Sequence, residues 1–461
     1  MAFPKALLWS LLIVMGAASA TAGEPEVVFD YATSRQIFRD LGNEIKSNPN
    51  YGSPDKGPFL EGLPIRYPEV GDDDLTIDAL VIPARTKKSL VVQINSGIHG
   101  LEAPSGSYLQ QRFLTECLPS LPKDLLDETT FVVTHALNPW GFKNANRFNA
   151  SNVDLNRNCG GARPDGAFAR CDSNAHNAEY QTVKSVFDNL VRQDSPINLF
   201  FCRVWISAVS AYHGLFAGGP APIFKIATRG EQFMERALRG QTQDSEGIYF
   251  AGEDPQPECK AYQNFSKQFY QGEGRHRHSL TITWHTGYGA IGHLQYMADP
   301  SDKADPKLVC LLGEKVFAPD KLRSIDFEPT FKTCNDENVW LREVAPERRP
   351  NAGTGTNAYL TAEIGGQGGA GSVCAVLMAQ QIKLKQHTGK PRFKNAEEEQ
   401  KFRDRIFYVF NPVNDDVDIE GGSKKYIEIL NDHAESSCKA IEKYMRAVLQ
   451  TEPVPVGNSI R

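Results

Sequence analysis

Short apolar runs that are typical of buried strands alternate with longer amphipathic segments along this chain. The expected strands are rich in β-branched residues and cover Leu75 to Ile82, Leu90 to Ile94, Thr130 to Leu137, Ser279 to Trp284, Tyr359 to Ile364 and Ile406 to Phe410. The expected helices cover Ser105 to Thr115, Ala178 to Arg192, Phe224 to Arg239 and Ser372 to Lys385. The pattern predicts an α/β fold with a mixed, mostly parallel twisted sheet and helices on both faces.

The remaining segments indicate one domain with insertions. Glu24 to Gly71 is mixed and turn-rich, and we expect it to wrap the main domain. A last long helix is expected to begin near Ser423, a good N-cap, and to run through Leu449. Because no Pro- or Ser-rich linker interrupts the chain, we expect a single domain over residues 21–461. Polar, turn-rich insertions carrying cysteines are expected near 160–175 and 240–277.

The first residues have the composition of a secretory signal peptide. Lys5 precedes an apolar core from Ala6 to Ala18, and small residues favour cleavage after Ala20 or after Ala22. We therefore expect a signal peptide over residues 1–20 and a secreted or periplasmic protein. No other segment is expected to approach a membrane span, so the mature protein should have none.

Charge and cysteine content narrow the class further. The formal net charge is -6, and removal of Lys5 with the signal makes it -7. Mild acidity without basic clusters argues against a nucleic-acid partner. Nine cysteines in an exported chain predict several disulfides and a thiol left over, with Cys159 and Cys171 as the expected pair. The sequence leaves the oligomeric state open.

One strand end carries half of a metal site. The apolar run from Leu90 ends in a loop signal, and His99 and Glu102 follow it. Imidazole and carboxylate are both good zinc ligands. The alternative is that His99 caps a loop and Glu102 begins a helix, where a carboxylate suits the helix dipole.

A second strand end could supply the third ligand. The strand expected to end at Trp284 presents His285 before a Gly-containing loop. A hydrolytic zinc needs three protein ligands and one open position, so one Zn²⁺ on His99, Glu102 and His285 is a coherent site. The chain has ten histidines, however, and a His at a strand end is often structural.

The loop from Asn138 to Cys159 is dense in Asn and Arg. Arg147 and Arg157 carry planar forks that suit carboxylates and developing oxyanions, and Asn156 could share a carboxylate with Arg157. The alternative is a polar surface loop held by Asx turns. The position of the loop after a strand next to the metal strand favours the functional interpretation.

A further acid, Glu363, stands near the end of a β-rich run and could act as a general base. A strand Glu can instead be an edge or ion-pair residue. The glycines that follow match a dinucleotide fingerprint, but no acidic residue lies at a strand end about 20 residues on. The motifs of serine hydrolases, thermolysin-type peptidases and kinases are absent from the sequence.

Taken in order, these motifs resemble those of the zinc carboxypeptidase superfamily. The chain is most similar to a branch of carboxypeptidase-like proteins, many of them bacterial, whose substrates are largely unassigned. The matching pieces are SGIHGLEAPSGS, ALNPWGFKNANRFNASNVDLNRN, ITWHTGYG and LTAEIGG, and they extend over the core from about Leu90 to Gly366. The first two are specific as a pair.

The resemblance implies a function for each candidate residue. His99, Glu102 and His285 would hold zinc, and Glu363 would act as base toward water and then as acid toward the leaving amine. The three remaining candidates would act on the substrate. Arg147 would polarise the scissile carbonyl and stabilise the oxyanion. Asn156 and Arg157 would bind the terminal carboxylate of the substrate.

The chain departs from this branch in two ways. Trp284 precedes the third ligand where the branch usually carries an acid, and the gap between Glu102 and His285 is long. Three hypotheses follow. The first is an exported zinc carboxypeptidase that removes C-terminal residues from peptides. The second is a zinc amidohydrolase, or deacylase, acting on N-acyl amino acids, whose substrate also carries a free carboxylate. The third is a non-catalytic secreted binding protein on a peptidase scaffold.

Overall fold

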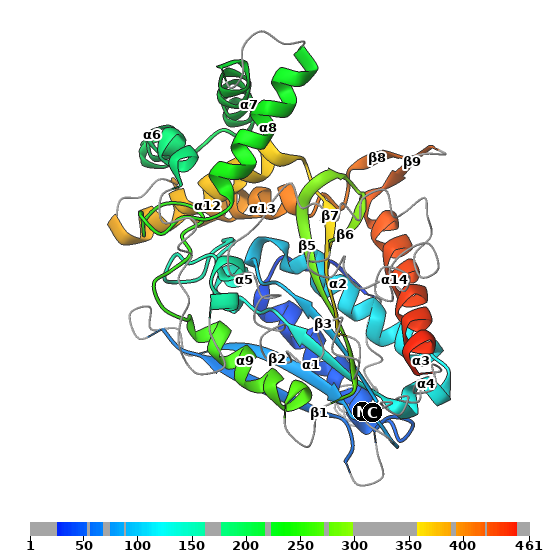
Figure 1. Ribbon diagram of the computed structural model, residues 1–461. Coiled ribbons are helices and arrows are strands. Elements are labelled where there is room, and N and C mark those ends of the chain that lie inside the picture. The colour runs from blue at the N-terminus through cyan, green and yellow to red at the C-terminus, as the bar shows by residue number, and fades with distance from the viewer. Residues whose placement is uncertain are drawn as a thin grey trace, which may run out of the picture.

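The computed structural model describes residues 25–52, 56–67, 74–86, 89–161, 177–216, 223–271, 276–297, 357–388, 393–419 and 422–449. The expected signal peptide and nearly all of the insertion expected near 160–175 lie outside these residues. Figure 1 shows a twisted sheet with helices packed on both of its faces.

A sheet of seven strands, in the order β1-β2-β4-β3-β5-β7-β6, forms the centre of the structure. The neighbours in the run β4-β3-β5-β7 pair in parallel. The pairs β1–β2, β2–β4 and β6–β7 are antiparallel, so that only β2 and β6 run against the other five strands. The predicted fold class is confirmed. The strands are β1 Phe59–Ile65, β2 Leu75–Ile82, β3 Leu90–Ser96, β4 Thr129–His135, β5 His278–Ile291, β6 Leu294–Met297 and β7 Asn357–Gly365.

Side-chain alternation along the strands divides the core into two parts. Along β3, Leu90, Val92 and Ile94 face one cluster, and Val91 faces the other. The first cluster is closed by the helices α1 Tyr31–Ser47, α2 Ala103–Arg112, α3 Leu118–Ser120, α4 Lys123–Glu128 and α14 Tyr426–Leu449. The second is closed by α5 Pro139–Lys143, α6 Ala178–Arg192, α7 Leu199–Phe216, α8 Ile223–Leu238, α9 Pro257–Tyr270, α12 Gly369–Thr388 and α13 Ala396–Phe410.

Helix α9 covers a polar stripe of the sheet. Gln93 and Asn95 lie fully buried on β3, on the face opposite Ile94. The Asn95 amide donates to Tyr262 Oη at 2.8 Å, and Tyr270 Oη donates to Gln93 Oε1 at 2.9 Å. Both tyrosines are on α9, so the segment expected to be a turn-rich insertion near 240–277 contains a helix that packs on the sheet. The division of the chain into a single domain with insertions stays a prediction.

Two sequence expectations near the C-terminus are wrong. Residues Ile406 to Phe410, expected to be a strand, end helix α13, because Phe402, Ile406 and Phe410 recur at helical spacing and are buried together. Asn395 caps this helix by accepting from the Glu398 amide at 2.8 Å. Ser423 does not cap the last helix. It lies in β9 Gly422–Lys425, which pairs with β8 Asp416–Ile419, and α14 begins at Tyr426.

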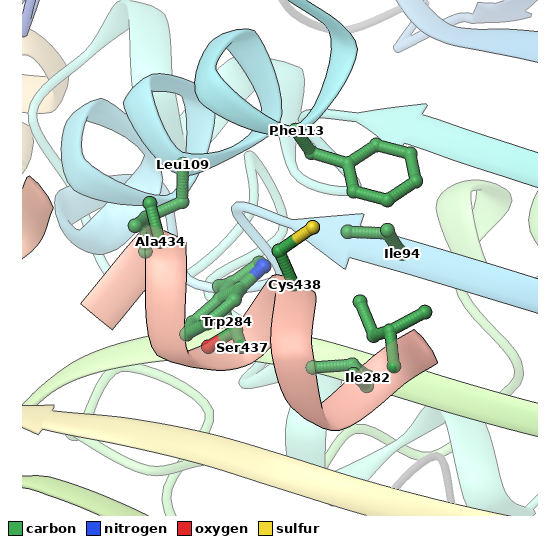
Figure 2. Close-up of a pocket in the computed structure, with 9 residues that line it drawn as sticks. Ile94, Leu109, Phe113, Ile282, Trp284, Ala434, Ser437 and Cys438 are labelled. Atoms are coloured by element: carbon green, nitrogen blue, oxygen red, sulfur yellow. The ribbon is translucent and has the colours of Figure 1, made fainter. Parts of the chain in front are cut away.

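Helix α14 packs on one face of the sheet, and Figure 2 shows the side chains at this contact. Side chains from α2, β3, β5 and α14 meet around a cavity of about 20 Å³, with Trp284 and Cys438 at its wall. A space of this size holds one water molecule at most, so the contact belongs to the core and not to a ligand site.

Several disulfides were predicted, and three join the described residues: Cys117–Cys438, Cys159–Cys259 and Cys202–Cys374. The expected Cys159–Cys171 pair is wrong, because α9 brings Cys259 to Cys159 across 100 residues of sequence. The packing of α9 against the rest of the fold therefore decides this pairing, and the shortness of the loop between Cys159 and Cys171 does not.

One described helix, α7, is long and apolar enough to cross a membrane by length and composition, and 17% of it is buried. The expectation that no segment beyond the N-terminal run comes near a span is therefore wrong for α7. The cause is its sequence, which contains one Arg and no acidic residue.

The disulfide Cys117–Cys438, which joins α14 to the body of the protein, gives a prediction about stability. Replacing both Cys117 and Cys438 by Ala should lower the free energy of unfolding by about 2–5 kcal/mol, because the unfolded chain regains the freedom of a loop of 321 residues. Urea unfolding of the purified protein measures this change. An unfolding midpoint equal to that of the unmodified protein would contradict the prediction.

Candidate metal centre

Strands β3, β5 and β7 run in the same direction, and their carboxyl ends carry the candidate ligands and the candidate base. After β3, the chain turns at Gly97, whose φ of +66° and tight space against Ala103 and Ala136 suit only glycine. It then passes so close to α5 that a Cβ on Gly100 would lie 2.0 Å from the Gly141 carbonyl carbon. These two glycines bring His99 and the Glu102 side chain onto the edge of the sheet.

The three expected ligands lie together. His99, Glu102 and His285 are 2–3% exposed, and one ligand atom from each lies within 4.8 Å of the others. His99 Nδ1 lies 2.8 Å from Glu102 Oε1, and His285 Nδ1 lies 3.0 Å from Glu102 Oε2. Two imidazoles and one carboxylate are a common donor set of catalytic zinc. The residues present therefore fit a zinc ion.

A second carboxylate orients the first histidine. Asp154 Oδ1 lies 3.3 Å from His99 Nε2, on the side of the ring away from Glu102. A carboxylate that accepts from one ring nitrogen leaves the other free to bind a metal and raises its basicity. Asp154 is fully buried, and it also caps the short helix Leu155–Arg157 by accepting from the Asn156 amide.

Arg147 lies against these ligands. Its Nε donates to Asp154 Oδ2 at 3.0 Å, its Nη1 donates to Glu102 Oε1 at 3.2 Å, and its Nη2 lies 2.7 Å from His99 Nε2. The guanidinium is therefore in direct contact with two of the three candidate ligands and with Asp154. This location agrees with the function expected from the sequence, which stays a proposal.

Glu363 stands one strand away from His285. The two residues are register partners between β5 and β7. The Tyr288 N–H donates to Glu363 Oε1 at 2.8 Å. Burial, and then the charge of Glu102, raise the pKa of Glu363 to about 8, while His285, the Tyr288 amide and Arg147 act to lower it.

The pKa values of the other two acids, Glu102 and Asp154, are lowered, so both carboxylates stay ionised. Burial alone would raise the pKa of Glu102, but the charges and hydrogen bonds of His99 and His285 outweigh it and lower the pKa. Burial is outweighed in the same way at Asp154, where Arg147 and Arg157 hold the pKa well below its usual range. The site thus combines two carboxylates held ionised with a third, Glu363, that titrates near neutrality.

The expected carboxylate clamp is beside the centre but is differently engaged. Arg157 is buried, with its Nε donating to the Arg239 carbonyl at 2.7 Å and its Nη1 to the Asn156 carbonyl at 3.1 Å. Its guanidinium carbon lies 5.9 Å from the centre of the Tyr249 ring, and that of Arg147 lies 4.9 Å from the same centre. Both arginines thus lie against the same aromatic ring.

Buried contacts hold the loop that carries Arg147 and Asp154. Asn149 donates to Gln256 Oε1 at 2.9 Å and to Glu258 Oε2 at 3.3 Å. Tyr67 donates to the same Glu258 carboxyl group. From the other side, Lys383 of α12 donates to the Ala150 carbonyl at 2.8 Å. Burial lowers the pKa of this lysine to about 7.

Three residues at the site were not found from the sequence. Asp154 was within the quoted motif, and the need of a metal-binding histidine for an acceptor could have singled it out. Tyr249 lies in the segment that was expected to be an insertion. Only its contacts with Arg147 and Arg157 in the structure show that it belongs to the site. Tyr288, whose hydroxyl donates to Glu235 Oε1 at 2.9 Å, links α8 to Glu363.

Comparison with known proteins supplies the context. A family model described as a protein of unknown function, DUF2817, matches residues 65–215. No curated protein matches the chain in sequence. Bovine thrombin-activatable fibrinolysis inhibitor, solved in complex with tick carboxypeptidase inhibitor, is 11% identical, with 92% of this chain and 98% of that chain covered and a TM-score of 0.44.

Two further solved structures are similar to this chain. Carboxypeptidase A from Helicoverpa armigera is 11% identical, with 94% of this chain and 78% of that chain covered and a TM-score of 0.42. A protein from Shewanella amazonensis, provisionally placed in the succinylglutamate desuccinylase / aspartoacylase family, is 14% identical, with 72% and 73% covered and a TM-score of 0.28. The function therefore has to be argued from the geometry of the site.

The arrangement predicts how the centre binds metal. His99→Ala should abolish stoichiometric zinc binding, because it removes one of three ligands. Asp154→Asn should still bind zinc, but with an affinity lowered by about 10–100-fold, since the amide cannot orient the His99 imidazole as a carboxylate does. Competition with a chromophoric chelator measures both affinities. Undiminished zinc affinity in Asp154→Asn would exclude Asp154 as the residue that orients His99.

The loop support predicts a pH dependence. Burial raises the pKa of Glu258 from 4.5 to about 7, against hydrogen bonds from Tyr67 and Asn149. The stability that Glu258 contributes is therefore complete below about pH 4.5 and is lost as the pH rises through 7. The unfolding free energy of the wild type minus that of Glu258→Gln, from urea titrations at pH 4 to 8, should fall across this window. A constant difference would contradict the raised pKa.

Proposed function

We propose that this protein is an exported zinc-dependent hydrolase that removes C-terminal residues from peptides. The observation that carries the proposal is the cluster of His99, Glu102 and His285 with Glu363 on the next strand and Arg147 in contact with the ligands. A Lewis acid, a general base and a cation for the oxyanion are the three elements that metal-assisted hydrolysis of an amide requires.

The chain's residues divide the reaction between them. Zinc on the three ligands would polarise the scissile carbonyl and lower the pKa of water. Glu363 takes a proton from the attacking water and passes it to the leaving amine. Arg147 stabilises the negative charge that develops on the carbonyl oxygen.

The end of the site that binds the substrate's carboxylate is assigned to Asn156 and Arg157. Both follow Asp154 directly, on the short helix Leu155–Arg157, and Arg157 shares the Tyr249 ring with Arg147. The bonds from Arg157 to the Arg239 and Asn156 carbonyls hold its guanidinium in one orientation. A cation held in this way keeps a fixed distance from Arg147, and a fixed distance selects substrates by the separation of amide and carboxylate.

Export is supported by the three disulfides, since such bonds persist in oxidising compartments. The signal peptide expected over residues 1–20 would direct this export. The third hypothesis, a binding protein without activity, has less support because ligands, base and arginine are all present at one edge of the sheet.

A deacylase acting on N-acyl amino acids is the second candidate. One observation favours it: a cleft of about 940 Å³ opens between α7 and the loop that follows β7. Apolar side chains of Leu199, Phe200 and Val204 line it, together with Arg203 and Arg405. The loop begins three residues after Glu363, so the cleft lies against the segment that follows the proposed base.

Glu363 gives the test of catalysis. Glu363→Gln should keep zinc affinity within a factor of about two and lose turnover by about 10²–10⁴-fold, because the amide cannot carry the proton. Turnover is followed by mass spectrometry of a peptide library and of N-acyl amino acids, each with and without a zinc chelator. Loss of single C-terminal residues supports the peptidase, and release of acyl groups alone supports the deacylase. Full activity of Glu363→Gln would remove it as the base.

A further inference from the structure

Helix α7 exposes an apolar face that no described part of the chain covers. The most exposed large side chains on it are Phe200, Phe201, Val204, Trp205, Tyr212, Leu215 and Phe216, at 46–70% exposure. Phe201, Trp205, Tyr212 and Phe216 recur at helical spacing, so they form a stripe along the helix. Isolated apolar side chains on a surface are ordinary, but a continuous aromatic stripe marks an interaction site.

The exposure is a property of a helix with a fixed position. The opposite face of α7 is buried at Cys202, Ile206 and Gly214. Cys202 is bonded to Cys374 of α12, and Arg203 Nη2 donates to the Gln367 carbonyl at 2.8 Å. These bonds fasten the first turn of α7 to the body of the protein.

The packing of α7 on α8 is equally close. A Cβ on Gly214 would lie 2.1 Å from the Ile226 carbonyl oxygen, and one on Gly230 would lie 2.3 Å from the Ser210 carbonyl oxygen. The His213 ring stacks on Phe233 with centroids 4.0 Å apart. Figure 1 shows the two helices projecting beyond α12 and α13, away from the sheet. The stripe is therefore presented outward by a rigid pair of helices.

The charges beside the stripe select its occupant. No acidic residue occurs on α7, whereas Arg203 lies on it and Lys225 and Arg229 lie on the first half of α8. Of the two acids on α8, Glu235 is bonded to Tyr288 near the body. Together the two helices carry four basic and two acidic residues, whereas the chain as a whole has a net charge of -6.

We propose that α7 and α8 form a membrane-surface anchor, with the aromatic stripe of α7 inserted among the headgroups of an anionic bilayer. Aromatic side chains prefer the boundary between headgroups and hydrocarbon, and basic residues beside them are attracted to anionic lipids. Since Cys202–Cys374 and the contact of Gly214 with α8 hold α7 on the protein, the helix lies in the surface and does not cross the membrane.

This anchor is independent of the proposed activity, but it bears on access to the site. Glu235 of α8 accepts from the Tyr288 hydroxyl, and the Tyr288 amide donates to Glu363. Phe200 and Val204 also line the cleft beside the loop after β7. Binding through α7 would place the mouth of this cleft at the lipid surface.

The test measures sedimentation of the mature, full-length protein with vesicles of phosphatidylcholine alone or with phosphatidylglycerol added. Binding to the anionic vesicles is expected. Phe201→Ser with Trp205→Ser should weaken it at least about tenfold, since two exposed aromatic side chains no longer enter the interface. Lys225→Gln should weaken binding to anionic vesicles only. Gln232→Ser, an exposed polar position on α8, is the matched control and should bind as the wild type does.

A fluorescence measurement identifies the inserted residue. Brominated lipids should quench Trp205, and Trp205→Phe should lose this quenching while keeping vesicle binding. Retained zinc affinity and retained hydrolysis of soluble substrate in the double Ser variant establish that it is folded. An inactive wild type that still binds vesicles would overturn the proposed function and leave the anchor standing.

Two results would overturn the anchor. One is the absence of vesicle binding, or binding that the double Ser variant does not weaken. The other is a dimer, seen in light scattering without lipid, that the double Ser variant dissociates. That outcome would assign the stripe to a second copy of the chain.

Discussion

The buried carboxylate of Glu102 is the interaction on which the rest of the site depends. Its two oxygens accept from Arg147 and from the Thr286 amide, and they lie within 3.0 Å of the Nδ1 atoms of both imidazoles. Burying a carboxylate charge costs much free energy unless several hydrogen-bond donors surround it. Those donors come from the loop after β3, from β5 and from the loop after β4, so the requirement of one carboxylate fixes the relative positions of three segments.

The sequence was informative where chemistry follows from local position. His99, Glu102 and His285 each stand at the end of an apolar run, and parallel strands bring such ends to one edge. Asp154 and Tyr249 were missed because their contacts join segments far apart in sequence. The failure at Ile406 to Phe410 has another cause: five apolar residues fit a strand or a buried helical turn equally, and only the packing of α13 distinguishes them.

Rigidity at the site is supplied from outside it. The loop that carries Arg147 and Asp154 is held by Glu258 of α9 on one side and by Lys383 of α12 on the other. Both supporting groups are buried and titrate near neutrality, one acid and one base. Two helices whose own sequences carry no catalytic motif therefore hold the loop of the candidate centre in place.

The Cys117–Cys438 bond has a consequence for the order of assembly. It joins the end of the α2 region to the last helix across 321 residues, and α14 then covers β3 and β5, which were synthesised much earlier. If the chain is exported from its N-terminus, as proposed, that face of the sheet stays exposed until α14 emerges. The closing of this long loop is thus a late event, and an open apolar sheet has to be protected from aggregation until it occurs.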